Sequence, residues 1–508
     1  MTLLSGRCLP KIDRDDQRYL TLLDLHRRLG AKDATMWGPR AQAEASMRMN
    51  WIDLPESSRQ LLPQLDALCA KHREKTRVIL CGMGGSSLGP EVIAQSYKRE
   101  LFILDSTDPN YIAHALEGDL ASTLVIVSSK SGSTIETTSM LALFTDRLLA
   151  VGLLPTHHLV VITDPGSALD KDARSNGLTV INADPNVGGR FSVLGAFGLV
   201  PAALIGIDVS ILLDSASETK KSFLKDPSFV VDIAYAVAFL STQYVNLCDD
   251  KSAMPGLSDW IEQLVAESTG KDGVGKLPVV IESIDQSSGF CIAFSGEADL
   301  VISADLASQF IIWEWVTALV CAALSIDPFN QPNVTEAKEA TAALLTGWAE
   351  GVPTLTPSAT DENIQIFGDG GCIQEAFALF IKSIPRDGYI AVMAYLDRRD
   401  DAKISQIRAL LSTKSSRPVT FGWGPRLLHS TGQFHKGGRH NGAFLQITGD
   451  VEEDVDISGQ SYGFTRLIAA QALGDGQALS SRKYPLLRLH LNNRATGIDR
   501  LISALTSL

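Results

Sequence analysis

The sequence contains few cysteines, and their spacing matches no metal or disulfide motif. All seven are scattered through the 508 residues, and no two are spaced as C-x-x-C. Neither a zinc site nor a disulfide framework is indicated, and this usage is typical of a reducing compartment. The positions are Cys8, Cys69, Cys81, Cys248, Cys291, Cys321 and Cys372.

Long apolar segments and an excess of positive charge are also missing. The two longest apolar stretches, 197–213 and 311–326, are broken by Asp208 and Glu314, and the first residues show no apolar leader. We therefore expect a cytoplasmic protein with no membrane span. Lys and Arg total 45 against 58 Asp and Glu, a formal net charge of −13. This balance disfavours nucleic acid as a partner but allows a locally positive pocket for a small anion.

Short runs of β-branched and aliphatic residues alternate with helix-length segments in the first half of the chain. The residues between the runs have helical spacing, most clearly at 135–152. This alternation predicts an α/β fold with a doubly wound parallel sheet covered on both faces. The expected strands are 77–83, 101–105, 123–127, 159–163 and 178–182.

The rest of the chain is less regular. We expect a helical N-terminal segment, helices over 229–242, 310–325 and 401–411, and strands over 277–283, 289–294, 388–396, 418–424 and 442–448. The stretch 350–360, rich in Pro, Ser and Thr, resembles a linker. The predicted organisation is a helical segment (1–75), two α/β domains (76–212 and 213–348) and a smaller C-terminal α/β domain (349–508).

The stretch SSKSGSTIETTSM, residues 128–140, follows the expected strand 123–127 directly. Ligands of doubly wound sheets bind beyond the carboxyl ends of the strands. Ser133 and Glu136 match an S-x-x-E capping box, which predicts a helix beginning at Thr134. Free N–H groups at a helix start, hydroxyl donors and the charge of Lys130 together would hold a phosphate.

A second loop of the same kind, CGMGGSSLGPEV at 81–92, follows another expected strand. Its glycines allow close backbone approach, and Pro90 suits the first turn of a helix. Either loop alone would be read as an ordinary helix cap, whereas two on neighbouring strands favour a phosphate site. A dinucleotide-binding fold is the alternative, with Asp105 placed for a ribose contact, although Ser87 replaces the last glycine of G-x-G-x-x-G. Residues 270–276 match the start of a Walker-type motif, but Leu277 stands where the motif requires Ser or Thr, which disfavours a P-loop.

Five ordered segments resemble the motifs of the glucose-6-phosphate isomerase family, which is built from two sugar isomerase (SIS) domains. They are GMGGSSLGP (82–90), SSKSGSTIET (128–137), VGGRFSVLGAFGLVPAALIGID (187–208), QLVAESTGKDGVG (263–275) and DPFNQPNVTEAK (327–338). The tail GPRLLHSTGQFHKGGRHNGAFLQIT (424–448) is similar to the isomerase half of fused transaldolase–glucose-6-phosphate isomerases. With the tail included, the resemblance covers nearly the whole chain.

The resemblance implies interconversion of glucose 6-phosphate and fructose 6-phosphate through a cis-enediol, in glycolysis and gluconeogenesis, with no metal or other cofactor. Such chemistry needs a base that moves a proton between C1 and C2 and a cation beside the enediolate. By position in the motifs, Glu267 matches the proton-shuttling glutamate, Arg190 the cation and Lys338 a lysine near the ring oxygen. The matched substrate- and phosphate-binding positions are Gly85, Ser86, Ser129, Lys130, Ser131, Thr134, Gln331 and, more weakly, Thr137.

One expected residue type is missing. The family has a ring-opening histidine, but residues 268–428 contain none. We predict that His435, flanked by glycines in GQFHKGG, takes this role; the alternative is a solvated loop histidine. The three tail histidines, His429, His435 and His440, match no common metal-ligand spacing.

Two other functions are compatible with parts of the sequence. SIS domains also serve non-catalytic sugar-phosphate sensors, but a sensor needs the phosphate loops and no proton shuttle, so Glu267, Arg190 and Lys338 favour an enzyme. An amidotransferase-type isomerase would bring an N-terminal cysteine, and Cys8 is not so placed. The family implies a homodimer, and a separate transaldolase is a candidate partner.

Overall fold

The computed structural model describes residues 2–348, 351–353 and 355–508. The chain divides into two compact units. The first contains residues 1–105 and 118–331, and the second contains residues 106–117 and 332–508. Residues 332–348 therefore fold with the C-terminal part of the chain, so this division differs from the predicted boundary at 348/349.

The first sheet of the first unit has the strand order β3-β2-β4-β5-β6, all parallel. All five strands predicted between residues 77 and 182 are confirmed. They are β2 (Arg77–Gly82), β3 (Phe102–Leu104), β4 (Thr123–Ser128), β5 (Leu159–Thr163) and β6 (Thr179–Asn182). Since β3 lies on one side of β2 and β4 on the other, the strand order reverses between β2 and β4. This reversal makes a topological switch point, the usual place for a ligand in such sheets.

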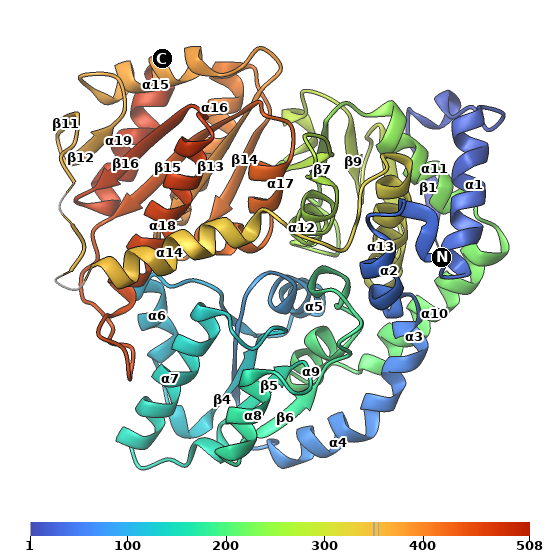
Figure 1. The fold of residues 1–508 in the computed structure, drawn as a ribbon, viewed down its shortest axis with the longest axis horizontal. Helices are drawn as coiled ribbons and strands as arrows, with labels where there is room; N and C mark the ends of the chain where they lie inside the picture. The colour runs from blue at the N-terminus through green and yellow to red at the C-terminus, as the bar shows by residue number, and fades with distance from the viewer. Residues whose placement is uncertain (1, 349–350, 354) are drawn as a thin grey trace. The chain divides into compact units, whose positions relative to one another are not determined.

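Helices cover both faces of this sheet, which explains why its strands are apolar throughout. Every residue of β4 and β5 is buried. On one face lie α4 (Leu62–Lys71), α5 (Leu88–Ser96) and α9 (Ala196–Leu204), and on the other lies α7 (Ile135–Ala150) (Figure 1). Helix α8 (Ala168–Ser175) contacts β5 and β6.

The second sheet of the first unit has the order β1-β10-β9-β7-β8. Strands β7 (Tyr244–Cys248), β8 (Leu277–Val280), β9 (Cys291–Ala293) and β10 (Leu300–Ser303) are parallel, and β1 (Leu3–Ser5) is antiparallel to β10. The predictions for β8 and β9 are confirmed, whereas β1, β7 and β10 were not predicted. The remaining helices of this unit are α1 (Gln17–Gly30), α2 (Gln42–Arg48), α3 (Leu54–Ser57), α10 (Val209–Lys225), α11 (Ser228–Tyr235), α12 (Leu257–Thr269) and α13 (Leu306–Ala323).

Helix α13 is the most apolar long helix described in the chain. By length and composition it could cross a membrane, but 94% of it is buried inside the protein, as expected of a core helix. It contacts α10, α11 and α12. Glu314 in its middle is fully buried, and burial raises the pKa of this carboxyl group well above its ordinary value.

The second unit contains one sheet with the order β11-β12-β16-β15-β13-β14. Strands β13 (Tyr389–Tyr395), β14 (Val419–Trp423), β15 (Gly442–Gly449) and β16 (Leu486–Leu491) are parallel, while β11 (Ala359–Asp361) and β12 (Ile364–Phe367) form an antiparallel edge. Helices α15 (Ile373–Ser383), α16 (Ile407–Ser415) and α19 (Arg494–Ser507) pack on one face, and α14 (Val334–Gly347) and α18 (Phe464–Ser481) lie on the other (Figure 1). The strands predicted at 388–396, 418–424 and 442–448 are confirmed.

Helix α6 (Pro109–Leu116) comes from the middle of the first unit's sequence but belongs to the second unit. Asp108 caps it by accepting from the backbone N–H groups of Asn110 and Tyr111. Arg494 forms ion pairs with Asp108 at 2.7 Å and with Asp401 at 3.1 Å. All three side chains are at least nine-tenths buried, so this cluster ties α6 to the C-terminal helix.

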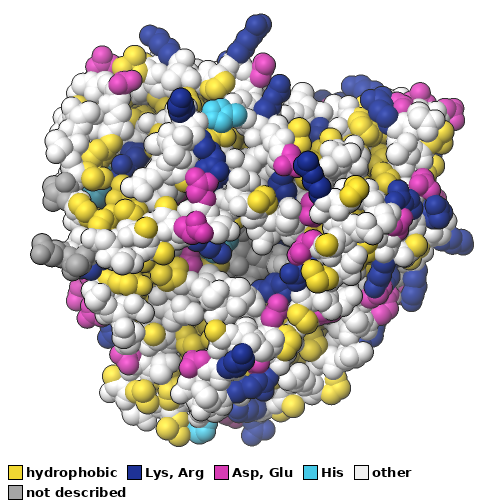
Figure 2. Space-filling view, viewed as in Figure 1, with side chains coloured by type: hydrophobic (Ala, Val, Ile, Leu, Met, Phe, Trp, Pro, Cys, Tyr) yellow, Lys and Arg dark blue, Asp and Glu magenta, His cyan; other side chains and the backbone are white. Residues whose placement is uncertain are grey.

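Acidic and basic side chains are interspersed over the face drawn in Figure 2.

Candidate active site

Two hydroxyl-rich loops meet at the switch point of the first sheet. Strand β2 ends at Gly82 and β4 ends at Ser128, and these two residues are register partners. The loops that follow the strands therefore begin side by side, as their parallel arrangement predicts.

The loop after β4 forms a cluster of hydroxyl groups. The Ser129 hydroxyl donates to Thr134 Oγ1 at 3.1 Å, and Ser131 Oγ lies 3.4 Å from the same atom. Helix α7 begins at Ile135 with Thr134 as its N-cap, and the Thr134 side chain accepts no hydrogen bond from the first N–H groups of the helix. The predicted capping box, with a helix beginning at Thr134, is wrong, because the N-cap is Thr134 rather than Ser133 and the helix begins one residue later. The Ser133 hydroxyl donates to Ser131 at 3.2 Å. The helix start is thus left available to an anion.

Lys130 does not stand as an isolated cation beside this cluster. Its ammonium group forms an ion pair with Asp164 at 2.6 Å and donates to the carbonyl of Pro185 at 3.3 Å. Burial lowers the pKa of Lys130 and raises the pKa of Asp164. Thr137 is buried, and its hydroxyl donates to the Thr134 carbonyl at 2.9 Å, within its own helix.

The loop after β2 approaches the loop that carries Arg190 very closely. A Cβ atom on Gly85 would lie 2.1 Å from the Gly189 carbonyl oxygen, so only glycine fits at this contact. The neighbouring Ser86 is buried. Ser87 donates to Asp105 at 3.4 Å, and Asp105 is itself buried, which does not fit the ribose contact of the dinucleotide alternative.

Arg190 and Glu267 form a buried ion pair. Arg190 Nη1 lies 3.0 Å from Glu267 Oε1, and the two side chains are only 3% and 12% exposed. Glu267 comes from the last turn of α12, and Gln263, one turn earlier, donates to its second oxygen at 3.2 Å. A carboxylate can accept a proton from carbon, and a guanidinium group beside it can stabilise the resulting oxyanion.

Arg190 also joins this pair to the motif at 327–338. Its Nη1 donates to Gln331 Oε1 at 2.9 Å, and its Nε donates to Ser268 at 2.9 Å. Its Nη2 donates to the carbonyl groups of Pro328 and Asn330. The structure therefore brings together three of the residues singled out in the sequence, Glu267, Arg190 and Gln331.

Lys271 is a buried cation at this site that was not singled out. Its side chain donates to the backbone carbonyl of Asp327 and is 2% exposed. Burial, followed by the charge of Arg190, lowers the pKa of Lys271 to about 7. The motif QLVAESTGKDGVG contains this lysine, but a single lysine in a polar stretch is usually solvated.

The two other predicted catalytic residues belong to the second unit. Lys338 is exposed on α14. His435 lies in the short helix α17 (Gly432–Gly437) and is buried, which corrects the expectation of a glycine-flanked loop. Its Nδ1 is 2.8 Å from the Tyr389 hydroxyl, and the two rings stack with centroids 5.7 Å apart. Burial lowers the pKa of His435 to about 3, so this imidazole is neutral, as in a core histidine.

These features define an α/β protein with a loop site at the switch point of a parallel sheet and a buried carboxylate–guanidinium pair in the same unit. Residues 67–289 match the family model described as phosphoglucose isomerase. The match includes both hydroxyl-rich loops, Arg190, Glu267 and Lys271.

Curated relatives carry the same description. A probable glucose-6-phosphate isomerase of Haloquadratum walsbyi is 31% identical over 245 residues, which are 46% of this chain and 57% of the relative. A glucose-6-phosphate isomerase of Campylobacter jejuni is 32% identical over 242 residues, 44% of this chain and 59% of the relative. The chain thus spans less than two thirds of the length of these relatives.

A solved structure supports the fold. The glucose-6-phosphate isomerase of Chlamydia trachomatis superposes with a TM-score of 0.55 at 18% identity, covering 69% of this chain and 89% of that one. At this identity the likeness concerns the fold, and it confirms the predicted α/β class.

Proposed function

We propose that this protein is an aldose–ketose isomerase that interconverts glucose 6-phosphate and fructose 6-phosphate through a cis-enediol. The observation that carries the proposal is the ion pair of Glu267 with Arg190, buried in the unit that carries the two hydroxyl-rich loops. Burying a carboxylate and a guanidinium group has a large desolvation cost, which a phosphate sensor would have no reason to bear. The pair therefore favours an enzyme over the sensor alternative.

Each residue in the proposal has a role that its chemistry allows. Glu267 moves the proton between C1 and C2, Arg190 stabilises the enediolate, and Gln331 orients Arg190 and the sugar. The phosphate is held by the two loops, and Lys130 exchanges Asp164 for the phosphate when substrate binds. The proposed phosphate-binding residues are Gly85, Ser86, Ser129, Lys130, Ser131, Thr134 and Thr137.

Ring opening is assigned to Lys338 ahead of His435. Lys338 is exposed on α14, whereas His435 is enclosed by Tyr389 and Phe444. A Lys338→Met variant should lose turnover of cyclic fructose 6-phosphate but keep isomerisation of an open-chain analogue. The opposite pattern, with the loss in a His435→Asn variant only, would return the role to His435.

The proposal also covers the cellular setting implied by the resemblance. The protein would act in glycolysis and gluconeogenesis in the cytoplasm, without a metal or cofactor, as a homodimer and with a separate transaldolase as a candidate partner. Light scattering of the purified protein tests the dimer, and co-purification with a transaldolase tests the partner.

The decisive experiment is an isomerase assay coupled to glucose-6-phosphate dehydrogenase, with Glu267→Gln beside the wild type. The amide keeps the size of the side chain and can still accept from Arg190, but it cannot take a proton from carbon. We expect kcat to fall by about 10²–10⁴-fold, with affinity for 6-phosphogluconate little changed. Glu218→Gln, at an exposed position of α10 in the same unit, is the matched control. Normal turnover of Glu267→Gln would remove Glu267 from the base role.

A further inference from the structure

One face of the sheet in the second unit is unusually polar. On β16, Leu487, Leu489 and Leu491 are buried in the core under α15, α16 and α19. The alternate residues Arg488 and His490 point to the opposite face, where helices also lie, and neighbouring strands add more polar side chains there. Sheets of this type normally have apolar residues on both faces. The departure indicates that this face serves a ligand.

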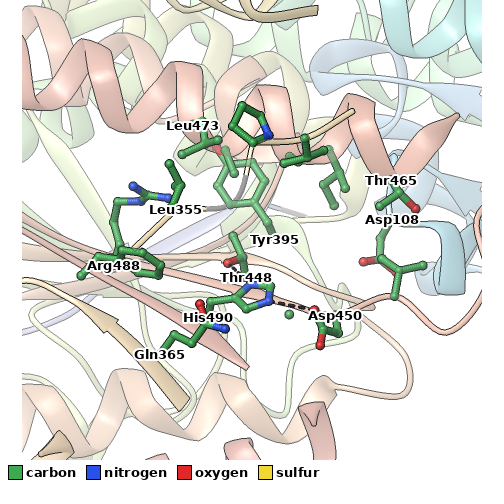
Figure 3. Close-up of a pocket in the computed structure, with 18 residues that line it drawn as sticks. Asp108, Leu355, Gln365, Tyr395, Thr448, Asp450, Thr465, Leu473, Arg488 and His490 are labelled. Atoms are coloured by element: carbon green, nitrogen blue, oxygen red, sulfur yellow. Dashed lines mark hydrogen bonds and ion pairs between the residues drawn. The ribbon is translucent and has the colours of Figure 1, made fainter. Parts of the chain in front are cut away.

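A cavity of about 380 Å³ lies on this face (Figure 3). Its volume is within the range of about 300–1,000 Å³ that small-molecule sites occupy. Tyr395 and Thr448 line it, and these two residues are register partners at the carboxyl ends of β13 and β15. Because β14 lies on one side of β13 and β15 on the other, the strand order reverses there. The cavity therefore occupies the switch point of a second doubly wound sheet.

Arg488 provides a positive charge in the cavity wall. Its Nε donates to Gln446 Oε1 at 3.1 Å, and its guanidinium carbon lies 5.2 Å from the centre of the Phe367 ring. Burial lowers the pKa of Arg488. Among the residues that the structure describes, no carboxylate forms an ion pair with Arg488. A largely buried guanidinium group normally has an anionic partner, and the position of Arg488 in the cavity wall suits the anionic group of a ligand.

The rest of the cavity has a different character. The Phe367 ring lies beside Arg488. Leu355 and Leu473 add further apolar lining to the cavity (Figure 3). At the other end His490 is held between Thr448 and Asp450, at 2.9 Å from each. The cavity thus offers a cation, an apolar slot and then a polar end.

We propose that this cavity binds a small organic anion with a flat apolar body, the anionic group on Arg488 and the body between Phe367 and Leu355. All residues that line it belong to the second unit, whereas Glu267, Arg190 and Gln331 belong to the first. Apart from Asp108, the residues that line the cavity also lie outside residues 67–289, the segment matched by the family model. The proposal does not depend on the isomerase assignment.

The test uses the full chain and a pair of dyes that differ in charge. 8-Anilinonaphthalene-1-sulfonate has an anionic group on a flat apolar body, and N-phenyl-1-naphthylamine is its uncharged counterpart. We expect saturable binding of the sulfonate, weakened at least about tenfold in Arg488→Met, since hydrogen bonds to charged groups contribute that much. Arg386→Met, at an exposed position in the same unit, is the control and should bind normally. Binding of the uncharged dye should be the same in all three proteins.

Other results would overturn the proposal. Equal affinity of the sulfonate for wild type and Arg488→Met would show that Arg488 holds no anion. Displacement of the dye by saturating fructose 6-phosphate would assign the dye to the sugar-phosphate site instead. Arg488→Lys keeps a charge at the same place, so loss of binding in Arg488→Met with partial retention in Arg488→Lys separates a charge effect from misfolding.

Discussion

Replacing Gly85 with alanine adds one methyl group where two loops of the candidate site touch. Its carbon would lie 2.1 Å from the carbonyl oxygen of Gly189 and 3.0 Å from the backbone nitrogen of Arg190. Both atoms belong to the backbone, so no side-chain rotation can relieve the overlap. Since ordinary contact begins at 3.4 Å, the loop that carries Arg190 must move by about 1.3 Å.

This displacement should reduce both stability and activity. Overpacking of this kind typically costs about 1–3 kcal/mol, so we expect Tm to fall by several degrees. The larger effect concerns Arg190, because a shift of more than 1 Å separates its guanidinium group from Glu267. A misplacement of about 1 Å can reduce a rate about 10²-fold, and we expect a loss of that size in kcat/KM.

The coupled isomerase assay and a thermal melt measure the two effects. Gly188→Ala is the matched control, because its Cβ would meet nothing closer than a ring carbon of Phe191 at 3.8 Å. That variant should keep the activity and Tm of the wild type. Wild-type activity and Tm in Gly85→Ala would refute the close approach of the two loops.

Three further predictions concern charged groups. Asp164→Asn should tighten binding of 6-phosphogluconate, because it releases Lys130 from its ion pair. Lys130→Met should weaken that binding by about 1.5–3 kcal/mol, and titration calorimetry measures both changes. Unchanged affinity in both variants would remove Lys130 from the phosphate site. The pKa of Lys271 is about 7 in the folded protein, against an ordinary value of 10.5. Between about pH 7 and pH 10.5 the unfolded chain therefore binds more protons at Lys271 than the folded one, and the free energy of unfolding should rise with pH. Urea unfolding near pH 7 and near pH 10 should show this rise in the wild type and a smaller one in Lys271→Met. Lys436 and Asp475 form an ion pair at 2.6 Å, with side chains 2% and 1% exposed. Asp475→Asn leaves the buried lysine without its partner, so a calorimetric melt should show a loss of about 3–5 kcal/mol in stability. The double variant Lys436→Met/Asp475→Leu removes both charges and should lose much less.

The sequence predicts the strands of the first sheet well because burial on both faces keeps each of them apolar over its whole length. Strand β1 was missed for the opposite reason. It has only three residues, and its partner β10 lies about 300 residues away in the chain. Such a strand is defined by its pairing, which local patterns do not contain.

Residues of the candidate site could be predicted from the sequence only where they lie in a recognisable motif and the motif indicates their role. Glu267 and Arg190 are unremarkable as single charged residues, yet their motifs place them together, and the structure shows them paired. Lys271 was missed because nothing in its neighbours shows that it is buried. His435 was misplaced in a loop because Tyr389, which encloses it, is 46 residues away.

The position of α6 in the second unit has a consequence for synthesis of the chain. Tyr111, Ile112 and Ala115 form its buried face, and Asp108 at its start pairs with Arg494, which is 386 residues later. At about 5–20 residues per second, roughly 20–80 s pass between the emergence of the two partners. During that interval the first unit can complete its own sheets, but α6 must wait with its apolar face uncovered. Chaperones that bind nascent chains should therefore contact residues 106–117 until Arg494 has been synthesised.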